Sequence, residues 1–341
     1  SPRGNAPLFR SFPPQNSPTR YFPRLSIVID DDLNNISSAS AYEWLPTYSR
    51  DMTFRCTVRD NNPEVGGVIW DQVAFKATES AGPFRVLSFD TRDTVRVGEY
   101  VNIEWDVANT DKAPVNCRQV NIKLSVDGGF TYPFTLIENV PNDGLQGVTF
   151  PDVDTRDARI MVEAADNIFY QINRADFVVA PTLGPGYTLD LGTSYQQVCL
   201  PDAVEIDLLS SSLLGYDSLV ALSINGLPVG AVTSFEKNPF IPADDNKLTV
   251  DLSEVTETEG IFELEIVAVA PSLDTAYRYV QLDLVYNEFK DMVPLEPING
   301  MSGASEKPIF SWHSSPFADS YLFELATSPA FGSSVIYSAL E

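Results

Sequence analysis

Short runs of β-branched and aromatic residues, separated by Gly, Pro, Asn and Asp, recur along this chain from about residue 52. Alternating apolar residues in such runs are typical of β-strands with one buried face, and helical periodicity is nearly absent. The pattern therefore predicts an all-β fold. The 341-residue length is enough for roughly two to four domains, and a hydrophobic fraction of 44% is ample for several cores.

Turn-forming clusters divide the chain into units. We expect tandem Ig-like and fibronectin III-like β-sandwich domains joined by short Pro/Gly-rich linkers, which make a semi-rigid string. The expected units are an extended Pro-rich segment at 1–24, a small β unit at 25–80, Ig-like sandwiches at 83–180 and 186–287, and an incomplete fibronectin III-like domain at 293–341. For residues 25–80, the remainder of an upstream domain is one interpretation.

The runs themselves predict the strands. The small unit carries runs at 52–58 and 68–77, each alternating as a strand with one buried face would, and one short helix is expected between Ile27 and Trp44, ahead of Leu45-Pro46. The predicted strands of the second unit are 84–89, 100–107, 120–125, 135–140, 147–150, 158–165 and 177–179. Those of the third unit are 187–191, 203–209, 219–224, 247–252, 260–268 and 279–285.

Both ends of the sequence suggest a piece of a longer protein. Residues 308–312 and 318–325 have the pattern of the first strands of a fibronectin-like sandwich that stops before it closes, so the last domain is expected to be truncated. At the other end, residues 1–24 have no signal-peptide pattern and no hydrophobic period.

The charge balance is strongly acidic, with 47 acidic against 22 basic residues, a net charge of −25 and a pI of about 4.2. Nucleic-acid binding is disfavoured, because phosphate neutralisation needs clustered Lys and Arg. No run approaches the ~18 apolar residues of a membrane helix, so direct membrane insertion is not expected.

Motifs for catalysis are missing. His313 is the single histidine and receives no function, and neither a His-containing triad nor HExxH can be assembled. There is no phosphate loop, dinucleotide fingerprint or GxSxG elbow. We therefore expect a chain that is not an enzyme and binds no cofactor. Three cysteines, Cys56, Cys117 and Cys199, leave two alternatives open: one bridge with a free thiol, or three buried thiols.

Calcium is the one metal worth considering, because hard cations take several oxygen ligands from Asp- and Asn-rich loops. None of the loops fits a DxDxDG pattern, and turn chemistry selects the same residue types, so calcium is a weak prediction. The candidate ligands are Asp30, Asp31, Asp32, Asp60, Asn61, Asn62, Asp152, Asp154, Asp157, Asp166 and Asn167.

One hairpin pattern is structural. Residues 125–132, SVDGGFTY, match an Asp-box, in which Asp127 caps the turn through backbone hydrogen bonds, Gly129 permits the bend, and an aromatic such as Tyr132 packs below with Thr131 beside it. A single copy does not indicate a sialidase propeller. Core positions are expected for the four tryptophans in preference to a sugar-binding platform: Trp44, Trp70, Trp105 and Trp312.

Several strings of the sequence resemble the region that follows the catalytic domain in secreted reprolysin-like zinc metallopeptidases of Bacteroidota. They are RYFPRL (20–25), FRCTVRDNN (54–62), GPF (82–84), VNIEWDVAN (101–109), APVNC (113–117), LSVDGGFTYP (124–133), NVPNDG (139–144) and DNIF (166–169). The resemblance covers roughly residues 8–290, and 297–341 is similar to fibronectin-like modules often appended further on.

The resemblance implies non-catalytic Ig-like modules, commonly followed by a type IX sorting signal, which are also used by large surface proteins of that phylum. It therefore also implies an extracellular or outer-cell-surface location in a bacterium. The zinc-binding helix of that family has no counterpart here. Three hypotheses follow: a structural or adhesive segment of a surface appendage or filament, an accessory region that positions substrate for or tethers a secreted metallopeptidase, and a carbohydrate-binding module. Expected partners are other copies of the chain, other surface proteins, or host, prey or matrix glycans and proteins.

Overall fold

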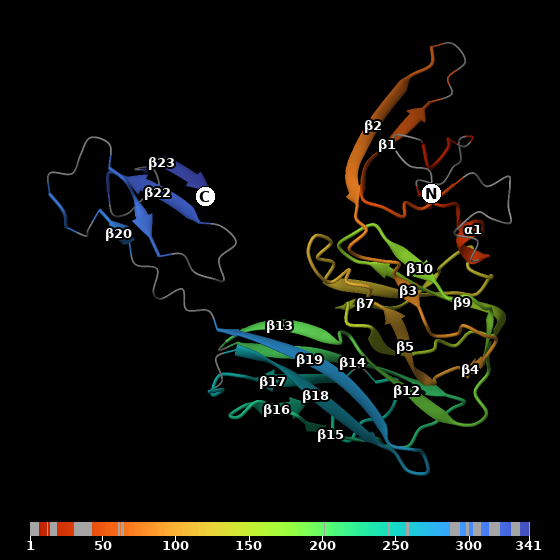
Figure 1. Ribbon diagram of the computed structural model, residues 1–341. Coiled ribbons are helices and arrows are strands. Elements are labelled where there is room, and N and C mark those ends of the chain that lie inside the picture. The colour runs from red at the N-terminus through yellow and green to blue at the C-terminus, as the bar shows by residue number, and fades with distance from the viewer. Residues whose placement is uncertain are drawn as a thin grey trace.

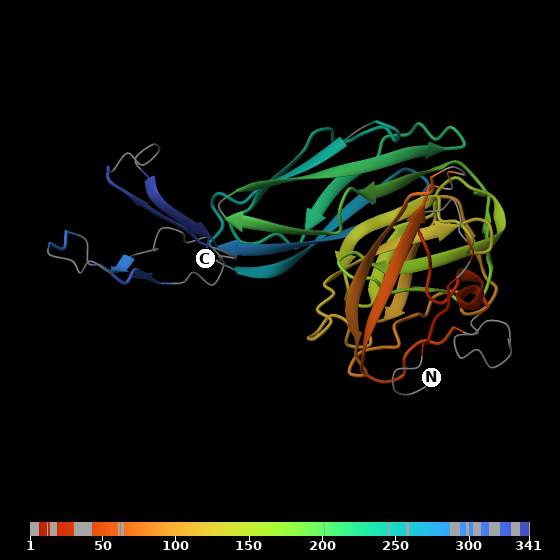
Figure 2. The same cartoon turned by 90° about the horizontal axis from the view of Figure 1, so that it is seen from above.

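The computed structural model is almost entirely β-structure arranged in separate sheets (Figure 1 and Figure 2). The structure describes residues 7–11, 13, 19–30, 43–60, 62, 65–200, 202–244, 246–256, 259–286, 294–297, 300–302, 308–313, 321–328 and 335–340. Along this part of the chain lie a projecting two-stranded ribbon, two β-sandwiches and a set of short C-terminal strands. Among these residues no helix has the length and apolar character needed to cross a membrane.

The second unit is an immunoglobulin-type sandwich. One sheet has the order β3-β5-β8, and the other has the order β4-β11-β9-β6-β7 with β10 paired to β9. The partition of β5 and β8 from β6, β9 and β11 is that of the immunoglobulin fold. The strands are β3 (Arg85–Val86), β4 (Thr94–Arg96), β5 (Tyr100–Asp106), β6 (Gln119–Ser125), β7 (Phe134–Pro141), β8 (Leu145–Thr149), β9 (Thr155–Ala164), β10 (Tyr170–Ile172) and β11 (Phe177–Ala180).

The third unit repeats this architecture. Its sheets have the orders β12-β14-β17-β16 and β13-β19-β18-β15, which is the four-plus-four arrangement of an immunoglobulin fold with an added edge strand. The strands are β12 (Gly186–Leu191), β13 (Tyr195–Leu200), β14 (Ala203–Leu213), β15 (Ala221–Asn225), β16 (Val232–Phe235), β17 (Asn246–Asp251), β18 (Glu259–Val269) and β19 (Ala276–Tyr286). The expected fold class, tandem β-sandwiches, is therefore confirmed.

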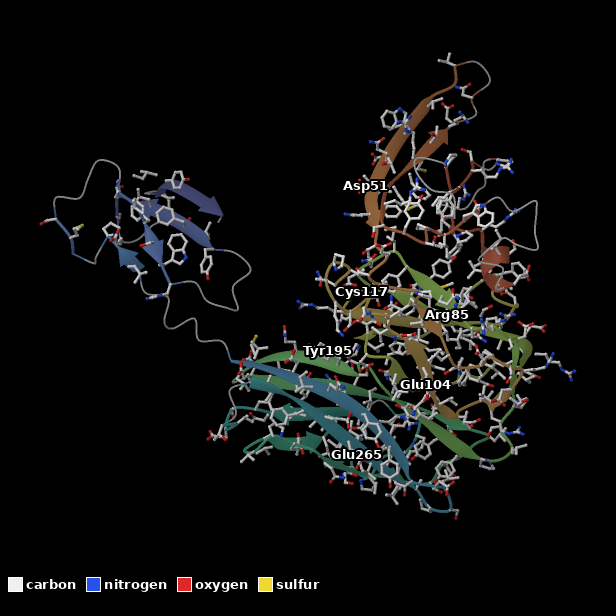
Figure 3. All side chains as sticks on the ribbon, viewed as in Figure 1. Asp51, Arg85, Glu104, Cys117, Tyr195 and Glu265 are labelled. Carbon is white, nitrogen blue, oxygen red and sulfur yellow. The ribbon has the colours of Figure 1, made fainter. Side chains whose placement is uncertain are left out.

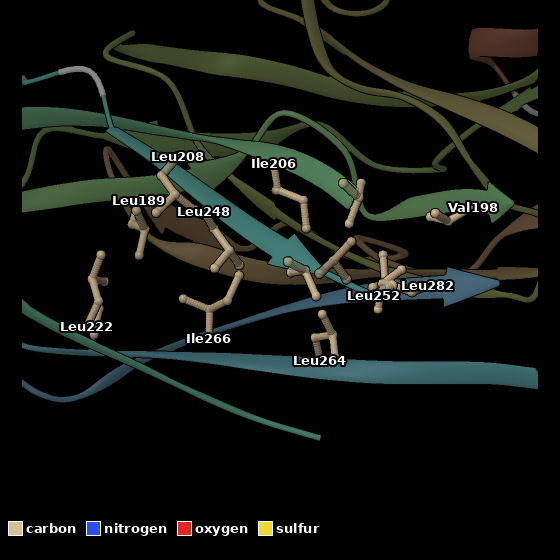
Figure 4. Packing of buried hydrophobic residues seen from close by; sticks show 14 of the residues in the cluster. Leu189, Val198, Ile206, Leu208, Leu222, Leu248, Leu252, Leu264, Ile266 and Leu282 are labelled. Atoms are coloured by element: carbon tan, nitrogen blue, oxygen red, sulfur yellow. The ribbon is translucent and has the colours of Figure 1, made fainter. Parts of the chain in front are cut away.

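Each sandwich has its own core, built by alternation along the strands. In the third unit, Ile206 and Leu208 of β14 face Leu264 and Ile266 of β18 across the two sheets, and all four are 1% exposed or less (Figure 4). Burying side chains of this size stabilises the fold by about 1.5–3 kcal/mol each. The residues between them point outward, so alternate positions of each strand form the core and the solvent-exposed surface.

Phenylalanine rings and a buried amide occupy the second core. Phe89 stacks on Phe177 with 4.0 Å between the ring centroids, and Phe150 meets Phe177 edge-on at 5.8 Å. Trp105 is 3% exposed, and its indole Nε1–H donates to Asn142 Oδ1 at 2.9 Å. This bond satisfies a donor that would be costly to leave unpaired in an apolar core.

The N-terminal region packs on the second unit. Helix α1 (Leu25–Ile29) places Val28 against Met161 and Ile172 on the outer side of β9 and β10. The fully buried Glu43 carboxylate accepts a hydrogen bond from Arg24 N at 2.6 Å and pairs with Arg20. The expected helix window, 27–44, therefore overlaps a short helix that begins two residues earlier, and residues 31–42 lie outside the described part.

The ribbon is an antiparallel hairpin of β1 (Arg50–Arg59) and β2 (Val68–Ala77). Its strands were expected to bury one face. That prediction is wrong for the half near the turn, where Val58, Ile69 and Val73 are 57%, 70% and 58% exposed. The reason is that two strands alone cannot cover a face of their own. Near the base the same face is half-buried, because Phe9 and Phe22 pack against Phe54.

Four C-terminal strands form two small sheets, β20 with β21 and β22 with β23. Their aromatic residues meet across the sheets: Trp312 stacks on Phe323 with 6.0 Å between centroids, and Phe310 lies 4.8 Å from Phe323. Trp312 is half-buried in this cluster. The strands are β20 (Pro294–Glu296), β21 (Ser311–Trp312), β22 (Leu322–Ala326) and β23 (Val335–Leu340).

We expect the substitution Asn142→Ala to lower the free energy of unfolding by about 1–3 kcal/mol, because it leaves buried groups without partners. Besides accepting from Trp105, the Asn142 amide donates to Thr110 Oγ1 at 2.9 Å and to Cys117 O at 3.1 Å. Urea denaturation followed by Trp fluorescence measures the change. Asn225→Ala, which removes an exposed amide bonded to Glu265, is the matched control and should shift stability by at most about 0.5 kcal/mol.

Candidate functional site

Within the described structure, the junction between the two sandwiches is a polar site with a buried charge and several directed contacts. β11 ends at Ala180 and β12 begins at Gly186, so the linker is short. Arg278 of β19 places its guanidinium carbon 3.9 Å from the centroid of the Tyr100 ring on β5, across the junction. The side chain of Arg278 is 6% exposed, which means that a cation is buried where the two units meet.

Several groups hold the Arg278 guanidinium in place. It donates from Nε to the Leu189 carbonyl and from Nη1 to the Tyr277 carbonyl at 2.7 Å. Burial lowers the pKa of Arg278, and the neighbouring Tyr100 and Asp190 act in the opposite direction. Burial likewise raises the pKa of Asp190, which the charge of Arg278 partly offsets. Since an arginine stays protonated under these conditions, the junction contains a permanent positive charge.

Close backbone approach seals the same junction. A Cβ at Gly147 would lie 2.1 Å from the Tyr100 hydroxyl, so only glycine lets the ring lie flat across β8 toward Arg278. On the other side, Leu213 of the third unit packs on the second core over Gly98, where a Cβ would lie 2.3 Å from Leu213 Cδ1. Ser194 Oγ also donates to Gln146 Oε1 at 2.8 Å across the interface.

The Asp-box residues lie in one tight turn after β6. Asp127 Oδ1 accepts hydrogen bonds from Phe130 N at 3.0 Å and Thr131 N at 2.9 Å, and Oδ2 accepts from Thr131 Oγ1 at 2.7 Å. Gly129 N donates to Ser125 Oγ at 2.8 Å. Burial would raise the pKa of Asp127, but the bonds from Thr131, Ser125 and Phe130 outweigh it and hold the pKa below its ordinary value.

Tyr132 connects this turn to the N-terminal segment. Its ring packs beside Val28, Met161 and Ile172, and burial raises the pKa of its hydroxyl. Arg159 lies nearby, 7% exposed, and its Nε pairs with Asp176 at 2.6 Å. The arrangement anchors α1 and, through it, the base of the ribbon; nothing in it resembles a substrate cleft.

On the ribbon, the calcium candidates Asp60 and Asn62 are hydrogen-bonded to each other in the turn. Asp60 Oδ1 accepts from Asn62 N at 3.1 Å and Gly67 N at 3.0 Å, and these bonds lower the pKa of Asp60. Asp30 follows the last residue of α1. Asp31, Asp32 and Asn61 lie outside the described residues.

The remaining candidates lie along the second unit. Asp152 and Asp154 are exposed before β9 and Asp157 is exposed within it. Asp166 accepts from Arg118 N at 3.4 Å, and Asn167 Oδ1 accepts from Ile168 N at 2.8 Å. Among the described residues no group of three or more His, Cys, Asp or Glu side chains could hold a metal ion. Calcium therefore stays a prediction that no arrangement here supports.

Neither cysteine alternative is correct. The three cysteines are all free, with Cys117 buried and Cys56 and Cys199 exposed, because both of the latter point outward from their strands. Burial, followed by the hydrogen bond and charge of Asp166, raises the pKa of the Cys117 thiol to about 12, so it stays protonated and unreactive.

The tryptophans also differ from expectation at one position. Trp70 is 53% exposed on the ribbon, so its assignment to a core is wrong, while Trp105 lies in the second core and Trp44 and Trp312 are half-buried. Sequence reasoning missed the junction residues Arg278, Tyr100 and Gly147. The sequence does contain a sign of this site: Arg278 occupies a position of β19 at which the alternating pattern calls for an apolar residue. The pattern alone does not say what a charged residue at such a position does.

No protein family and no curated protein matches this chain significantly. Among solved structures, domains 4 and 5 of the S-layer protein SbsC match with a TM-score of 0.23 and 12% identity over 40% of this chain and 68% of that one. Fibronectin(III)-like modules of Clostridium thermocellum CbhA match with a TM-score of 0.20 and 14% identity over 60% and 95%. The D0-D1 domain of intimin matches with a TM-score of 0.23 and 10% identity over 59% and 98%.

At these TM-scores no property of those proteins transfers to this chain. The assignment to immunoglobulin-type sandwiches rests on the strand orders of the second and third units. The resemblance to the accessory region of reprolysin-like metallopeptidases stays a prediction.

Replacing Arg278 with Met should loosen the junction. The substitution leaves the Leu189 carbonyl without its donor and removes the cation over Tyr100, which we expect to lower stability by about 2 kcal/mol. Small-angle X-ray scattering should show a larger radius of gyration as the two units move apart, with urea denaturation giving the stability. Arg85→Met, on the exposed surface of β3, is the control; equal behaviour of the two variants would contradict the role assigned to Arg278.

The Asp127→Ala variant should lose about 1–2 kcal/mol, because four donors in the turn, the hydroxyl of Ser125 among them, lose their acceptor. The folded pKa of Asp127 lies below its unfolded value, so the stability it contributes is present above about pH 4 and is lost as the pH falls through the folded pKa. Thermal unfolding between about pH 6 and pH 3 should therefore show the wild type and the variant converging in acid. Asp152→Ala, in an exposed loop, should run parallel to the wild type throughout.

Proposed function

We propose that this chain is a non-catalytic structural segment of an extracellular bacterial surface protein, in which successive immunoglobulin-type domains act as a stiff spacer. The observation that carries the proposal is the junction centred on Arg278, where a buried cation, a stacked ring and a hydrogen bond between Ser194 and Gln146 join the two sandwiches. A flexible linker would let the domains rotate, whereas a sealed interface with polar groups bonded across it favours one orientation.

The surface of the chain supports the same proposal. The net charge of −25 keeps copies soluble and repels polyanions. Residues 8–290 resemble modules of Bacteroidota secreted proteins, and residues 297–341 are similar to the fibronectin-like modules of such proteins. Both similarities favour export through type IX secretion and display at the outer surface. Adhesion to matrix or prey would follow from display, with the spacer holding a binding element away from the cell.

We expect an antibody raised against residues 83–286 to label intact cells of the source organism without permeabilisation, and external protease to remove the signal. Immunogold electron microscopy and protease shaving followed by immunoblotting measure this. A periplasmic protein of the same cells should stay protected from both reagents. Labelling that requires lysis would contradict the proposal, and so would peptidase or glycosidase activity of the purified chain.

A further inference from the structure

The ribbon of β1 and β2 stands away from both sandwiches, and its outer half is exposed on both faces (Figure 1). At its base, aromatic packing covers one face of the ribbon. The ring centroid of Phe22 lies 4.4 Å from that of Phe54, and Phe54 stacks on Phe75 with 5.4 Å between the centroids. The other face has no such cover among the described residues. A two-stranded ribbon is marginally stable in water by itself, so a protein that projects one benefits from a surface for it to rest on.

The uncovered face of the ribbon is basic, and we call it the basic face. Strand register places Arg55, Arg59 and Lys76 on it with Asp51 as its acid. Trp70 and Val68 lie on the same face and are 53% and 60% exposed. The Arg55 guanidinium carbon lies 4.1 Å from the centroid of the Trp70 ring, which orders both side chains. The face is therefore positively charged, opposite in sign to the net charge of −25 of the whole chain.

A complementary surface lies on the third unit, the outer face of the sheet β13-β19-β18-β15, which we call the acidic face. Strand register places the following residues on it, four of them acids and none a Lys or Arg: Glu259, Ile261, Glu263, Glu265, Tyr277, Tyr279, Gln281 and Asp283. Tyr277 and Tyr279 are 44% and 41% exposed, and Ile261 is 66% exposed.

The carboxylates of the acidic face are held by neutral donors. Glu265 accepts from Tyr279 OH at 3.2 Å and from Asn225 at 2.9 Å, and Asp283 accepts from Tyr195 OH at 2.7 Å. Burial and then the neighbouring Glu265 raise the pKa of Tyr279, consistent with an electronegative surface. The face borders a hollow of about 270 Å³ at the junction, to which Glu263 and Tyr279 contribute.

Within one chain these two faces cannot meet, because the second unit separates the ribbon from the third unit (Figure 1). Figure 3 shows the same separation at the level of side chains, with Asp51 on the ribbon and Glu265 on the far sandwich. A contact between them therefore requires two copies of the chain.

We propose that the basic face of the ribbon docks on the acidic face of a second copy of this chain. The inference deepens the proposed function, on which it rests, by naming the partner of the spacer. Both surfaces are pleated β-faces that can pack at about 10 Å, and they pair cations with acids and Trp70 with exposed tyrosines. The contact is head to tail, so a pair of copies still has one free basic face and one free acidic face, and further copies join it into an open chain.

Long-range repulsion does not prevent this contact. Charges farther apart than about 8 Å are largely screened at physiological ionic strength, whereas the paired faces come within contact distance. The acid excess then disfavours side-by-side association and leaves the complementary faces as the permitted contact.

The test is charge reversal on the 341-residue chain, followed by sedimentation velocity and multi-angle light scattering in about 0.15 M salt. The wild type should show species larger than a dimer that increase with concentration. Arg55→Glu with Arg59→Glu, and separately Glu259→Arg with Glu263→Arg, should each weaken association at least about tenfold. A mixture of the two double variants should associate again, because the unchanged basic face of one variant fits the unchanged acidic face of the other, and the two reversed faces are also of opposite charge.

Control variants reverse single charges of either sign elsewhere. Arg85→Glu and Glu104→Arg lie on exposed positions of the second unit, both labelled in Figure 3, and should associate as the wild type does. Circular dichroism and the thermal midpoint of each variant establish that it is folded.

Three outcomes overturn the inference: a wild type that stays monomeric at all concentrations, association that survives both reversals, or association lost only on replacing Val58, Ile69 and Val73 of the opposite ribbon face with Ser. Surface labelling of intact cells together with a monomeric chain would remove this inference and leave the proposed function standing. Self-association of a chain that is found inside the cell would do the reverse.

Discussion

The orientation of the two sandwiches depends on a cation buried between them. Moving a guanidinium out of water is costly unless its donors are used, and Arg278 uses them on the carbonyls of Leu189 and Tyr277 while its face covers the Tyr100 ring. Because Tyr100 belongs to one unit and Arg278 to the other, rotation about the linker would remove the ring that covers the guanidinium and expose the charge, while its bonds to Leu189 and Tyr277 within the third unit would remain. A hydrophobic patch would tolerate sliding; a directional charge contact does not, and so it selects one arrangement.

Where antiparallel strands alternate, the sequence predicted them well. The runs at 203–209 and 260–268 correspond to β14 and β18, since Val204, Ile206 and Leu264 repeat with a period of two that a sandwich core requires. The strands β4, β10, β13 and β16 were not predicted. Of these, β4 and β13 pair in parallel with the last strand of their unit, and β13 offers only Val198 and Leu200 as buried apolar residues. Such short edge strands are specified by a partner far along the chain, which local pattern cannot supply.

Alternation of apolar residues predicts a strand but does not predict whether its apolar face is buried, as the ribbon shows. Met52, Phe54 and Val58 alternate as core residues do, yet burial of Phe54 depends on Phe9 and Phe22 from a segment with no strand pattern, and Val58 has no such neighbour. The candidate site divides in the same way. The Asp127 turn could be predicted because all its bonds are local. The Arg278 junction could not, because its partners are separated by up to 178 positions in sequence and are brought together only by the packing of two finished domains.

The distribution of charge joins these observations into one argument. A chain with 47 acidic and 22 basic residues disfavours close contact between acidic surfaces of its copies, so a basic face such as that of the ribbon provides a favourable contact for an acidic one. The basic residues are carried on a ribbon that projects from the body, while the acidic sheet face belongs to the sandwich beyond the junction. If the junction were loose, the direction from one face to the other would vary between copies and a repeating contact could not propagate. The stiffness set by Arg278 is therefore a requirement for regular head-to-tail assembly as well as for a spacer, which connects a single buried cation to the geometry of any polymer this chain forms.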